Sequence, residues 1–338
     1  MSTVAKYQEE DPYQNWSELT YTEQFKILTY LPIQDRLRFS FTSRTSCYLS
    51  SFLFYNYHGF ELYGFSATHW RIYAVKNKYE KNEERKVGLF LDIIQDNETG
   101  YVRCSDIDGT EYWEEDMTAE MDAYRLATDY FKCMLRVNMN KIKKLVICGH
   151  NLADFDFGIK SMKNLESLEI DGDVDIHHFL PNIGHYLKNL TVRTRPEGQP
   201  LSKYRDIYHV SHSLHLTYTT LTYKQFRRVR ARCLVFSIGD LTPEDLFKFI
   251  NGFREVDYYE ETGDYQWNIR YSGFDVKELF QLLKISEKDA KEENIEIKQV
   301  SYPRKSGELS VTKSTIKFVW DFTKKPTELG KEDKKVAE

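Results

Sequence analysis

The most chemically suggestive stretch of the sequence is EIDGDVDIHH (169–178), in which three aspartates alternate with other residues and two histidines follow. Carboxylate oxygens suit Ca²⁺, and a calcium loop of the EF-hand type needs Gly at its sixth position and Glu at its twelfth. Counted from Asp171, those positions hold Ile176 and Asn182, so the calcium register fails. Gly and Asp are typical turn residues, and we therefore interpret the stretch as a strand end followed by an acidic turn.

Two further charged clusters favour solvated surface over chemistry. SDIDGTEYWEED (105–116) is acidic but lacks the full calcium register, and it is typical of a hairpin turn. YKQFRRVRARC (223–233) has the composition of a nucleic-acid patch or a nuclear targeting signal. On a helix its cations spread around the axis, so a solvated helix followed by a loop is favoured. These cations are Lys224, Arg227, Arg228, Arg230 and Arg232.

Local catalytic motifs are missing from the sequence. There is no GxSxG, P-loop, GxGxxG or HExxH, and the nine histidines are scattered. Five of them lie at or near proposed strands, where structural roles explain them better than metal binding: His177, His178, His209, His212 and His215. We predict a protein that is not an enzyme and has no catalytic residues, no cofactor and no metal. A hydrolase or nucleic-acid-binding protein that uses the charged clusters is the alternative from another class.

Composition indicates a folded chain with several elements. The 338 residues are 41% hydrophobic and 15% aromatic, which is enough for hydrophobic cores. A net charge of −5 gives no global nucleic-acid footprint, so binding to nucleic acid is not expected. The five cysteines form no CxxC pair, which favours reduced thiols in the cytoplasm or the nucleus. No secretory signal and no membrane-spanning segment are expected.

The N-terminal part predicts a short helical hairpin. Residues 1–14 are polar and predicted to be disordered, and residues 15–56 contain the stretch LTYTEQFKILTYLPIQDRLRFSFTSR (19–44). Thr20 and Glu23 have the spacing of a capping box, in which each side chain satisfies an unpaired amide of the other residue. Apolar residues follow at helical spacing, and Pro32 ends the helix before a second one begins around Asp35.

The middle of the chain changes to the period of strands. HWRIYAVKNKY (69–79), KVGLFLDII (86–94) and GYVRCSDIDG (100–109) predict short strands, and TAEMDAYRLATDYFKCMLRV (118–137) predicts a helix. Residues 57–137 therefore form a strand-rich connector plus a helix. At the other end, IEIKQV (295–300) and LSVTKSTIKFVWDF (309–322) predict a terminal strand pair within 286–323, and the charged tail 324–338 is predicted to be disordered.

A repeat fills residues 138–285. A short strand pattern centred on Leu returns at intervals of 20 to 24 residues, with a weaker sixth copy in REVDYY at Val256. This period is typical of leucine-rich-repeat solenoids, although the Asn of the standard repeat is missing and a non-solenoid α/β layer is the alternative. The five leucines are Leu145, Leu168, Leu190, Leu214 and Leu234. The predicted fold class is mixed α/β: a three-helix hairpin, an irregular solenoid and a terminal strand pair.

The N-terminal hairpin resembles the F-box, a domain of about forty residues. The matching residues are Leu19, Glu23, Ile27, Leu28, Leu31, Pro32, Asp35, Arg36, Leu37, Ser43, Arg44 and Leu49, whereas Thr20 and Ser46 replace the usual Pro and aromatic residue. The resemblance implies binding to a Skp-family linker that joins a cullin ubiquitin ligase. It also implies that nine residues are divided between packing of the hairpin and binding of the linker. They are Leu19, Phe25, Ile27, Leu28, Leu31, Pro32, Asp35, Leu37 and Phe41.

The C-terminal region is similar to the F-box-associated regions expanded in nematodes. The similarity lies in SLHLTYTTLTYKQFRRVRARCLVFSIGDLTPEDLFKFINGF (213–253) and in SYPRKSGELSVTKSTIKFVWDF (301–322). It implies a substrate-recognition subunit whose F-box docks the linker and the cullin scaffold, and whose C-terminal region binds an unknown client protein for ubiquitination. The alternative is a ligase-independent scaffold with a divergent F-box.

Overall fold

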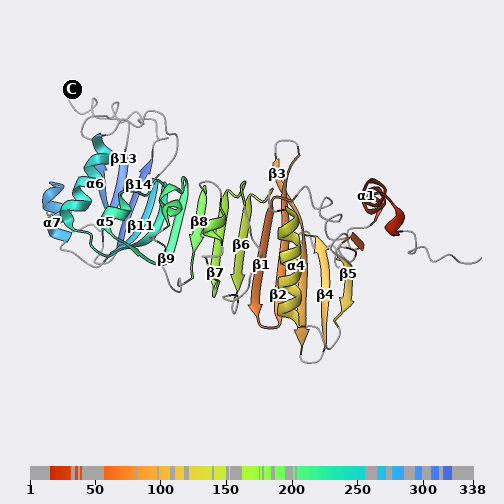
Figure 1. Cartoon of the computed structure of the whole chain (residues 1–338). Coiled ribbons are helices and arrows are strands. Elements are labelled where there is room, and N and C mark those ends of the chain that lie inside the picture. Colours follow the sequence, from red (N-terminus) through yellow and green to blue (C-terminus); the bar gives the residue numbers. More distant parts are fainter. Residues whose placement is uncertain are drawn as a thin grey trace, which may run out of the picture. The chain divides into compact units, whose positions relative to one another are not determined.

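The computed structural model divides into two compact units. Figure 1 labels helices and strands of both units in chain order. Unit 1 comprises Met1–Lys143 and Asp156–Lys163, and unit 2 comprises Lys144–Phe155 and Asn164–Glu338. The structure describes residues 16–31, 35–36, 39, 57–80, 83–96, 99–106, 111–117, 122–138, 141–149, 152, 162–174, 176, 179–183, 187–194, 201, 204–255, 265–271, 276–284, 294–298, 306–311 and 315–321. The predicted mixed α/β class is confirmed.

Unit 1 contains an antiparallel sheet in which each strand pairs with the next along the chain. Before it come a 3₁₀ turn, η1 (Trp16–Glu18), and helix α1 (Tyr21–Tyr30). The strands are β1 (Gly59–Ser66), β2 (His69–Glu80), β3 (Glu83–Asp96), β4 (Thr99–Asp106) and β5 (Glu111–Asp116). The strands predicted at 69–79 and 86–94 therefore lie inside β2 and β3, and the one predicted at 100–109 corresponds to β4 up to Asp106, with residues 107–109 outside the described residues.

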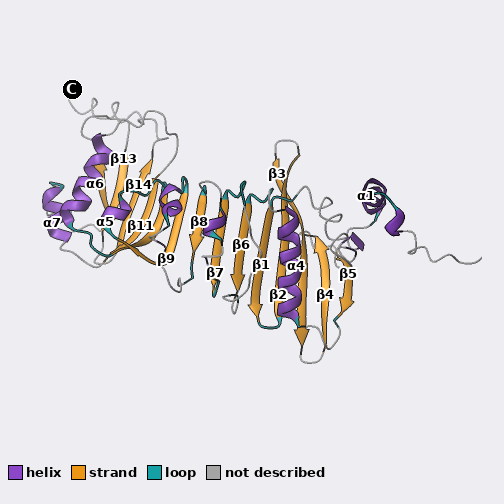
Figure 2. Cartoon of the chain, in the orientation of Figure 1, coloured by secondary structure: helices purple, strands orange, loops and turns teal. Residues whose placement is uncertain are grey.

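Helix α4 (Ala123–Asn138) packs on one face of this sheet, against β2 and β3 (Figure 2). Alternation explains the choice of face, because successive side chains of a strand point to opposite sides. Along β2, Trp70 and Ile72 are buried, and Trp70 makes an edge-to-face contact with Tyr124 of α4 at 5.4 Å between ring centroids. The intervening residues of β2 face away from α4. The helix predicted at 118–137 is confirmed from Ala123 onward, and residues 118–121 lie outside the described residues.

Unit 2 is a sheet whose first six strands are parallel. They are β6 (Lys144–Gly149), β7 (Ser167–Gly172), β8 (Asn189–Val192), β9 (Ser213–Leu221), β10 (Cys233–Ile238) and β11 (Tyr265–Tyr271). Helical segments lie between them: η4 (Leu180–Asn182), η6 (Arg205–His209), α5 (Tyr223–Phe226) and α6 (Pro243–Glu255). None of the helices in the described part of the chain is both long and apolar enough to cross a membrane.

The repeated leucines of the sequence are direct neighbours across these parallel strands. The pairing runs Leu145, Leu168, Leu190, Leu214 and Leu234, from β6 to β10, and all five side chains are buried. We call this set the leucine row. Each strand contributes one member because the repeat places one short strand in every period. The row is a continuous core because its five buried members are direct neighbours. Burial of each leucine side chain contributes about 2 kcal/mol to stability.

The sixth position of the leucine row corrects the sequence prediction. Trp267 of β11, and not Val256, pairs with Leu234. Helix α6 continues to Glu255, so the first residues of REVDYY are helical, and Val256 lies outside the described residues. The apolar residues of α6 recur at helical spacing, so this segment forms a helix. The next strand, β11, therefore begins only at Tyr265, after the helix. The solenoid interpretation itself stays a prediction.

The C-terminal strands run antiparallel beside β11. The order is β11, β14 (Thr315–Asp321), β13 (Ser306–Val311) and β12 (Asn294–Lys298), and helix α7 (Val276–Leu282) precedes them. The stretch 309–322, predicted as one strand, forms two strands in a hairpin, so the predicted strand pair is a set of three. Within the stretch 309–322, β13 ends at Val311 and β14 begins at Thr315.

Glycine is required where β6 and β7 end. Gly172 has φ +89°, and a Cβ built on it lies 2.1 Å from the carbonyl oxygen of Gly149, its cross-strand partner. The same oxygen accepts a hydrogen bond from the Asp173 amide at 3.0 Å. Only glycine combines this backbone conformation with so close an approach of two chains.

Candidate functional site

Helix α1 begins with the predicted capping box, which is confirmed. The Thr20 amide donates to Glu23 Oε2 at 2.8 Å, and the Glu23 amide donates to Thr20 Oγ1 at 3.4 Å. The Thr20 hydroxyl also donates to the carboxylate, and this hydrogen bond lowers the pKa of Glu23. Amides that are unpaired at a helix start are thus satisfied by local side chains.

The C-terminal end of α1 is held by a side chain from the following segment. Arg36 donates from Nε to the carbonyl of Leu31 and from Nη2 to the carbonyl of Thr29, both at 2.6 Å. Carbonyls at the end of a helix have no partner inside the helix, and a guanidinium suits both their hydrogen bonds and the helix dipole. Arg36 thereby fixes where the chain goes after α1.

One side of α1 is packed against the surrounding chain. Leu28 is completely buried, and Gln24 is buried beside it, where its Nε2 donates to the carbonyl of Trp16 at 2.7 Å. Trp16 in turn makes an edge-to-face contact with Phe39 at 4.9 Å between ring centroids. These contacts tie the 3₁₀ turn, α1 and the segment around Phe39 into one structural element.

The other side of α1 exposes large apolar side chains. Ile27 is 42% exposed and Tyr30 is 78% exposed, and residues three apart on a helix lie on one face. Tyr21, in the first turn, is also 65% exposed, but it lies seven positions before Leu28 and therefore on the Leu28 side of the helix. An exposed aliphatic–aromatic pair on a helix is the kind of surface that docks into an apolar groove of a partner.

The residues predicted to bind the linker occupy three kinds of position. Leu28 is buried, and Ile27 is exposed. The half-buried ones are Leu19, Phe25, Leu31 and Asp35, and those outside the described residues are Pro32, Leu37 and Phe41. The exposed Tyr21 and Tyr30 were not predicted, although the spacing of Tyr30 from Ile27 is a signal for a shared face.

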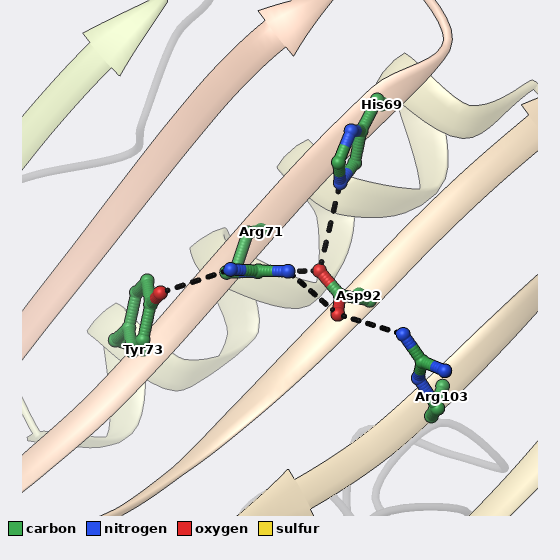
Figure 3. Close-up of polar contacts among 5 residues, drawn as sticks. All are labelled: His69, Arg71, Tyr73, Asp92 and Arg103. Carbon is green, nitrogen blue, oxygen red and sulfur yellow. Dashed lines mark hydrogen bonds and ion pairs between the residues drawn. The ribbon is translucent and has the colours of Figure 1, made fainter. Parts of the chain in front are cut away.

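A buried carboxylate lies on the face of the unit 1 sheet that points away from α4 (Figure 3). Asp92 of β3 is completely buried and accepts hydrogen bonds from Arg71 of β2, from Nε at 2.5 Å and from Nη2 at 2.9 Å. Arg103 of β4 approaches it at 3.5 Å, and His69 Nε2 lies 3.6 Å away. The bond to Asp92 raises the pKa of Arg71 further above its already high value.

Aromatic rings surround this charge cluster. The guanidinium carbon of Arg71 lies 5.7 Å from the ring centroid of Phe65, 5.9 Å from that of Tyr73 and 5.1 Å from that of Phe90. Cations attract the faces of aromatic rings at such distances. We call the set the platform; it consists of Phe65, Arg71, Tyr73, Phe90, Tyr101 and Arg103, and the buried Asp92 lies between Arg71 and Arg103.

The charged clusters singled out in the sequence have structural partners. In the stretch 169–178, Glu169 and Asp171 pair with Arg193, which directly follows β8, at 2.8 Å and 3.3 Å, and β7 ends at Gly172 as predicted. Asp175, His177 and His178 lie outside the described residues. Within the parts of the chain that the structure describes, no group of three or more His, Cys, Asp or Glu side chains could hold a metal ion.

The other two clusters also take the predicted local structure. Within 105–116, the end of β4 and the whole of β5 pair antiparallel, and residues 107–110 between them lie outside the described residues. The arginine-rich stretch begins with the short helix α5, and Arg228 stacks over Tyr208 with 4.5 Å between the guanidinium carbon and the ring centroid. Cys104 is buried on the α4 side of β4. Burial raises the pKa of its thiol to about 12, so this thiol does not suit the role of a nucleophile.

His215 of β9 has a pKa whose direction of shift can be tested. Burial lowers its pKa below 6.5, and the neighbouring positive charges of Arg193 and Arg270 lower it further. We expect its imidazole resonances to titrate below 6.5 in the folded protein, and Arg193→Gln to move the midpoint upward. Since the unfolded chain then binds more protons, stability should rise with pH from the lowered pKa up to 6.5. Titration of the NMR signal that His215→Asn removes tests this, and a midpoint at or above 6.5 contradicts it.

Comparison with known proteins identifies one family in the chain. Residues 16–53 match the F-box domain. No curated protein and no solved structure is significantly similar to the chain. The matched segment contains η1, α1, Arg36 and Phe39, which are the elements joined by the contacts of α1 described above.

Proposed function

With an F-box domain at residues 16–53 as the premise, we propose that this protein is a substrate-recognition subunit of a cullin-type ubiquitin ligase. F-box domains typically bind Skp-family linkers, and F-box proteins are generally non-catalytic adaptors of ubiquitin ligase complexes. The F-box docks the linker, and the remainder of the chain binds a client protein. Such an adaptor acts by proximity, because a held client lysine has a high effective concentration near the ubiquitin carrier. The protein then works in the cytoplasm, the nucleus or both.

One observation supports the assignment of the docking surface. The two sides of α1 differ: Leu28 is buried against its own domain, whereas Ile27 and Tyr30 are exposed. Neighbouring apolar side chains exposed on one helix face are typical of a surface that binds a partner. We therefore assign Ile27 and Tyr30 to linker contact and Leu28 to domain packing.

The test is binding of the full-length chain to a purified Skp-family linker. We expect Ile27→Asp to weaken binding by about a hundredfold, as for a residue at the centre of an interface. The control is Lys26→Asp, which places the same charge one helical position away at an exposed site. Circular dichroism checks that both variants keep their helix content.

Two results contradict parts of the proposal. If the intact chain does not bind the linker, the ligase role fails and the ligase-independent scaffold takes its place. If the linker binds but both variants bind as tightly as the unchanged chain, Ile27 is not in the interface and the assignment of this face of α1 is wrong.

A further inference from the structure

Strand β5 leaves one edge of the unit 1 sheet open to a further strand. Among the residues that the structure describes, β5 pairs with β4 on one side, and no strand lies on its other side. An edge strand presents a row of backbone amides and carbonyls with which another extended chain can pair. Addition of a strand to such an edge is one of the recurring ways in which proteins bind peptides.

The pairing of β5 with β4 fixes which backbone groups point outward. The Met117 amide donates to the carbonyl of Gly100 at 2.7 Å, and these residues continue the register in which Asp116 pairs with Tyr101. In an antiparallel pair, residues that exchange hydrogen bonds alternate with residues whose amides and carbonyls point away from the partner strand. Counted back from Met117, the outward-pointing groups of β5 belong to Asp116 and Glu114.

The same two residues carry exposed carboxylates. Glu114 and Asp116 lie on one face of β5, and neither carboxylate forms a hydrogen bond or an ion pair with another residue that the structure describes. Arg103, the cross-strand partner of Glu114, pairs with a different carboxylate, that of Asp92. The two arginines of the platform are outnumbered by carboxylates on the same side of the sheet, which include Glu61, Asp92, Glu114 and Asp116.

Charge selects among the chains that can add to this edge. The six residues of β5, EYWEED, include four acidic residues and neither Lys nor Arg. A second copy of β5 would place carboxylates opposite carboxylates, and like charges directly opposite each other on two strands are destabilising. The phosphates of a nucleic acid meet the same repulsion. A strand with Lys or Arg opposite Glu114 and Asp116 forms favourable cross-strand pairs instead.

We infer that the open edge of β5 binds an extended segment of another protein that has Lys or Arg at two alternate positions. The segment adds as an antiparallel strand, and its two basic residues lie directly opposite Glu114 and Asp116. There they exchange backbone hydrogen bonds with β5 and pair with the two carboxylates on one face. The spacing of two positions follows because successive side chains of a strand point to opposite faces. The identification of this segment as part of a client rests on the proposed adaptor role, whereas its chemistry rests on β5.

Binding of labelled peptides to the full-length protein, measured by fluorescence anisotropy, tests the inference. The probe is a nine-residue peptide of Ser, Thr and Val with Lys at its fourth and sixth positions. We expect replacement of both Lys residues by Glu to weaken binding by about tenfold. A peptide with Lys at its fourth and fifth positions has the same charge but puts one Lys on the other face, and it should bind about threefold more weakly.

Methylation of the peptide backbone separates strand addition from simple attraction between charges. N-methylation of the two Lys residues removes the amide donors that face β5, and it should weaken binding by about tenfold. The matched control carries its two N-methyl groups on the third and fifth residues, whose amides point away from β5. We expect this control peptide to bind as tightly as the unmethylated probe.

Variants of β5 locate the bound peptide. Glu114→Gln and Asp116→Asn should each weaken binding of the Lys peptide by about threefold, and the double variant by about tenfold. The control is Asp129→Asn, which makes the same substitution at an exposed position of α4, on the opposite face of the sheet, and should leave binding unchanged.

Several results would overturn the inference. Equal binding of the Lys and Glu peptides, or unchanged binding by the double variant, removes the two carboxylates as the recognition groups. Equal effects of the two methylation patterns show attraction without strand addition. Self-association of the full-length chain that competes with the Lys peptide assigns the edge to a second copy. Linker binding, measured separately, distinguishes the two proposals: a chain that binds the linker but not the peptide refutes only the β5 site, and the reverse result refutes only the ligase role.

Discussion

Replacement of Asp92 by Ala should lower the free energy of unfolding of unit 1 by about 4 kcal/mol. The carboxylate is completely buried and is paired with Arg71 through two hydrogen bonds. Its removal leaves the guanidinium of Arg71 between aromatic rings without its counter-charge, and the positive charge of Arg103 nearby adds repulsion. Loss of one partner from a buried ion pair costs more than the pair itself contributes, because the remaining charge stays desolvated.

Hydrogen–deuterium exchange of the β2 and β3 amides, followed in increasing urea, measures this change within unit 1. The control is Asp171→Ala in unit 2, which removes a partly exposed carboxylate from its pair with Arg193 and is followed by exchange of the β7 and β8 amides. Exposed ion pairs contribute little, so the control should change stability by less than about 1 kcal/mol. Equal effects of the two substitutions would show that burial of Asp92 has no special role.

Substitution of Gly172 by Ala should destabilise unit 2 by about 3 kcal/mol. The added methyl group meets the carbonyl oxygen of Gly149 on the neighbouring strand at 2.1 Å, and the residue has a φ of +89°. Two costs therefore combine: a strained backbone conformation, and the separation of β6 from β7 at their paired ends. Backbone atoms cannot move aside as a flexible side chain can.

Gly239→Ala provides the control for that experiment. A Cβ at Gly239 comes within 3.1 Å of a methyl group of the Thr220 side chain, which is able to rotate. We expect a change of less than about 1 kcal/mol. Exchange of the β6 and β7 amides in urea measures both variants, and a loss for Gly172→Ala no greater than that for Gly239→Ala would contradict the explanation.

The sequence predicted the fold best where a repeat in the sequence forms a repeated strand in the sheet. The leucines from Leu145 to Leu234 predicted a series of short strands, and these residues pair directly in the structure. The capping box of Thr20 and Glu23 was also predictable, because it depends on residues three apart. The strand at 265–271 was missed because the weak pattern at Val256 occupied the next place in the series, where α6 ends instead.

The platform was not predicted because its parts are far apart in the chain. Arg71 and Asp92 are separated by 21 positions, and their pairing follows from the register of β2 with β3. Alternation held a partial signal: Arg71 and Tyr73 share one face of β2, and Phe90 and Asp92 share one face of β3. The sequence does not give the register of β2 with β3, so it does not indicate that these two strand faces lie on the same side of the sheet.

The leucine row also has a consequence for the synthesis of the protein. Its members follow one another at 23, 22, 24 and 20 residues, so every strand from β7 to β10 pairs with the one translated just before it. Folding by addition of neighbours avoids the slow closure of long loops. Each strand from β7 to β10 therefore has a pairing partner that is already synthesised when it emerges from the ribosome.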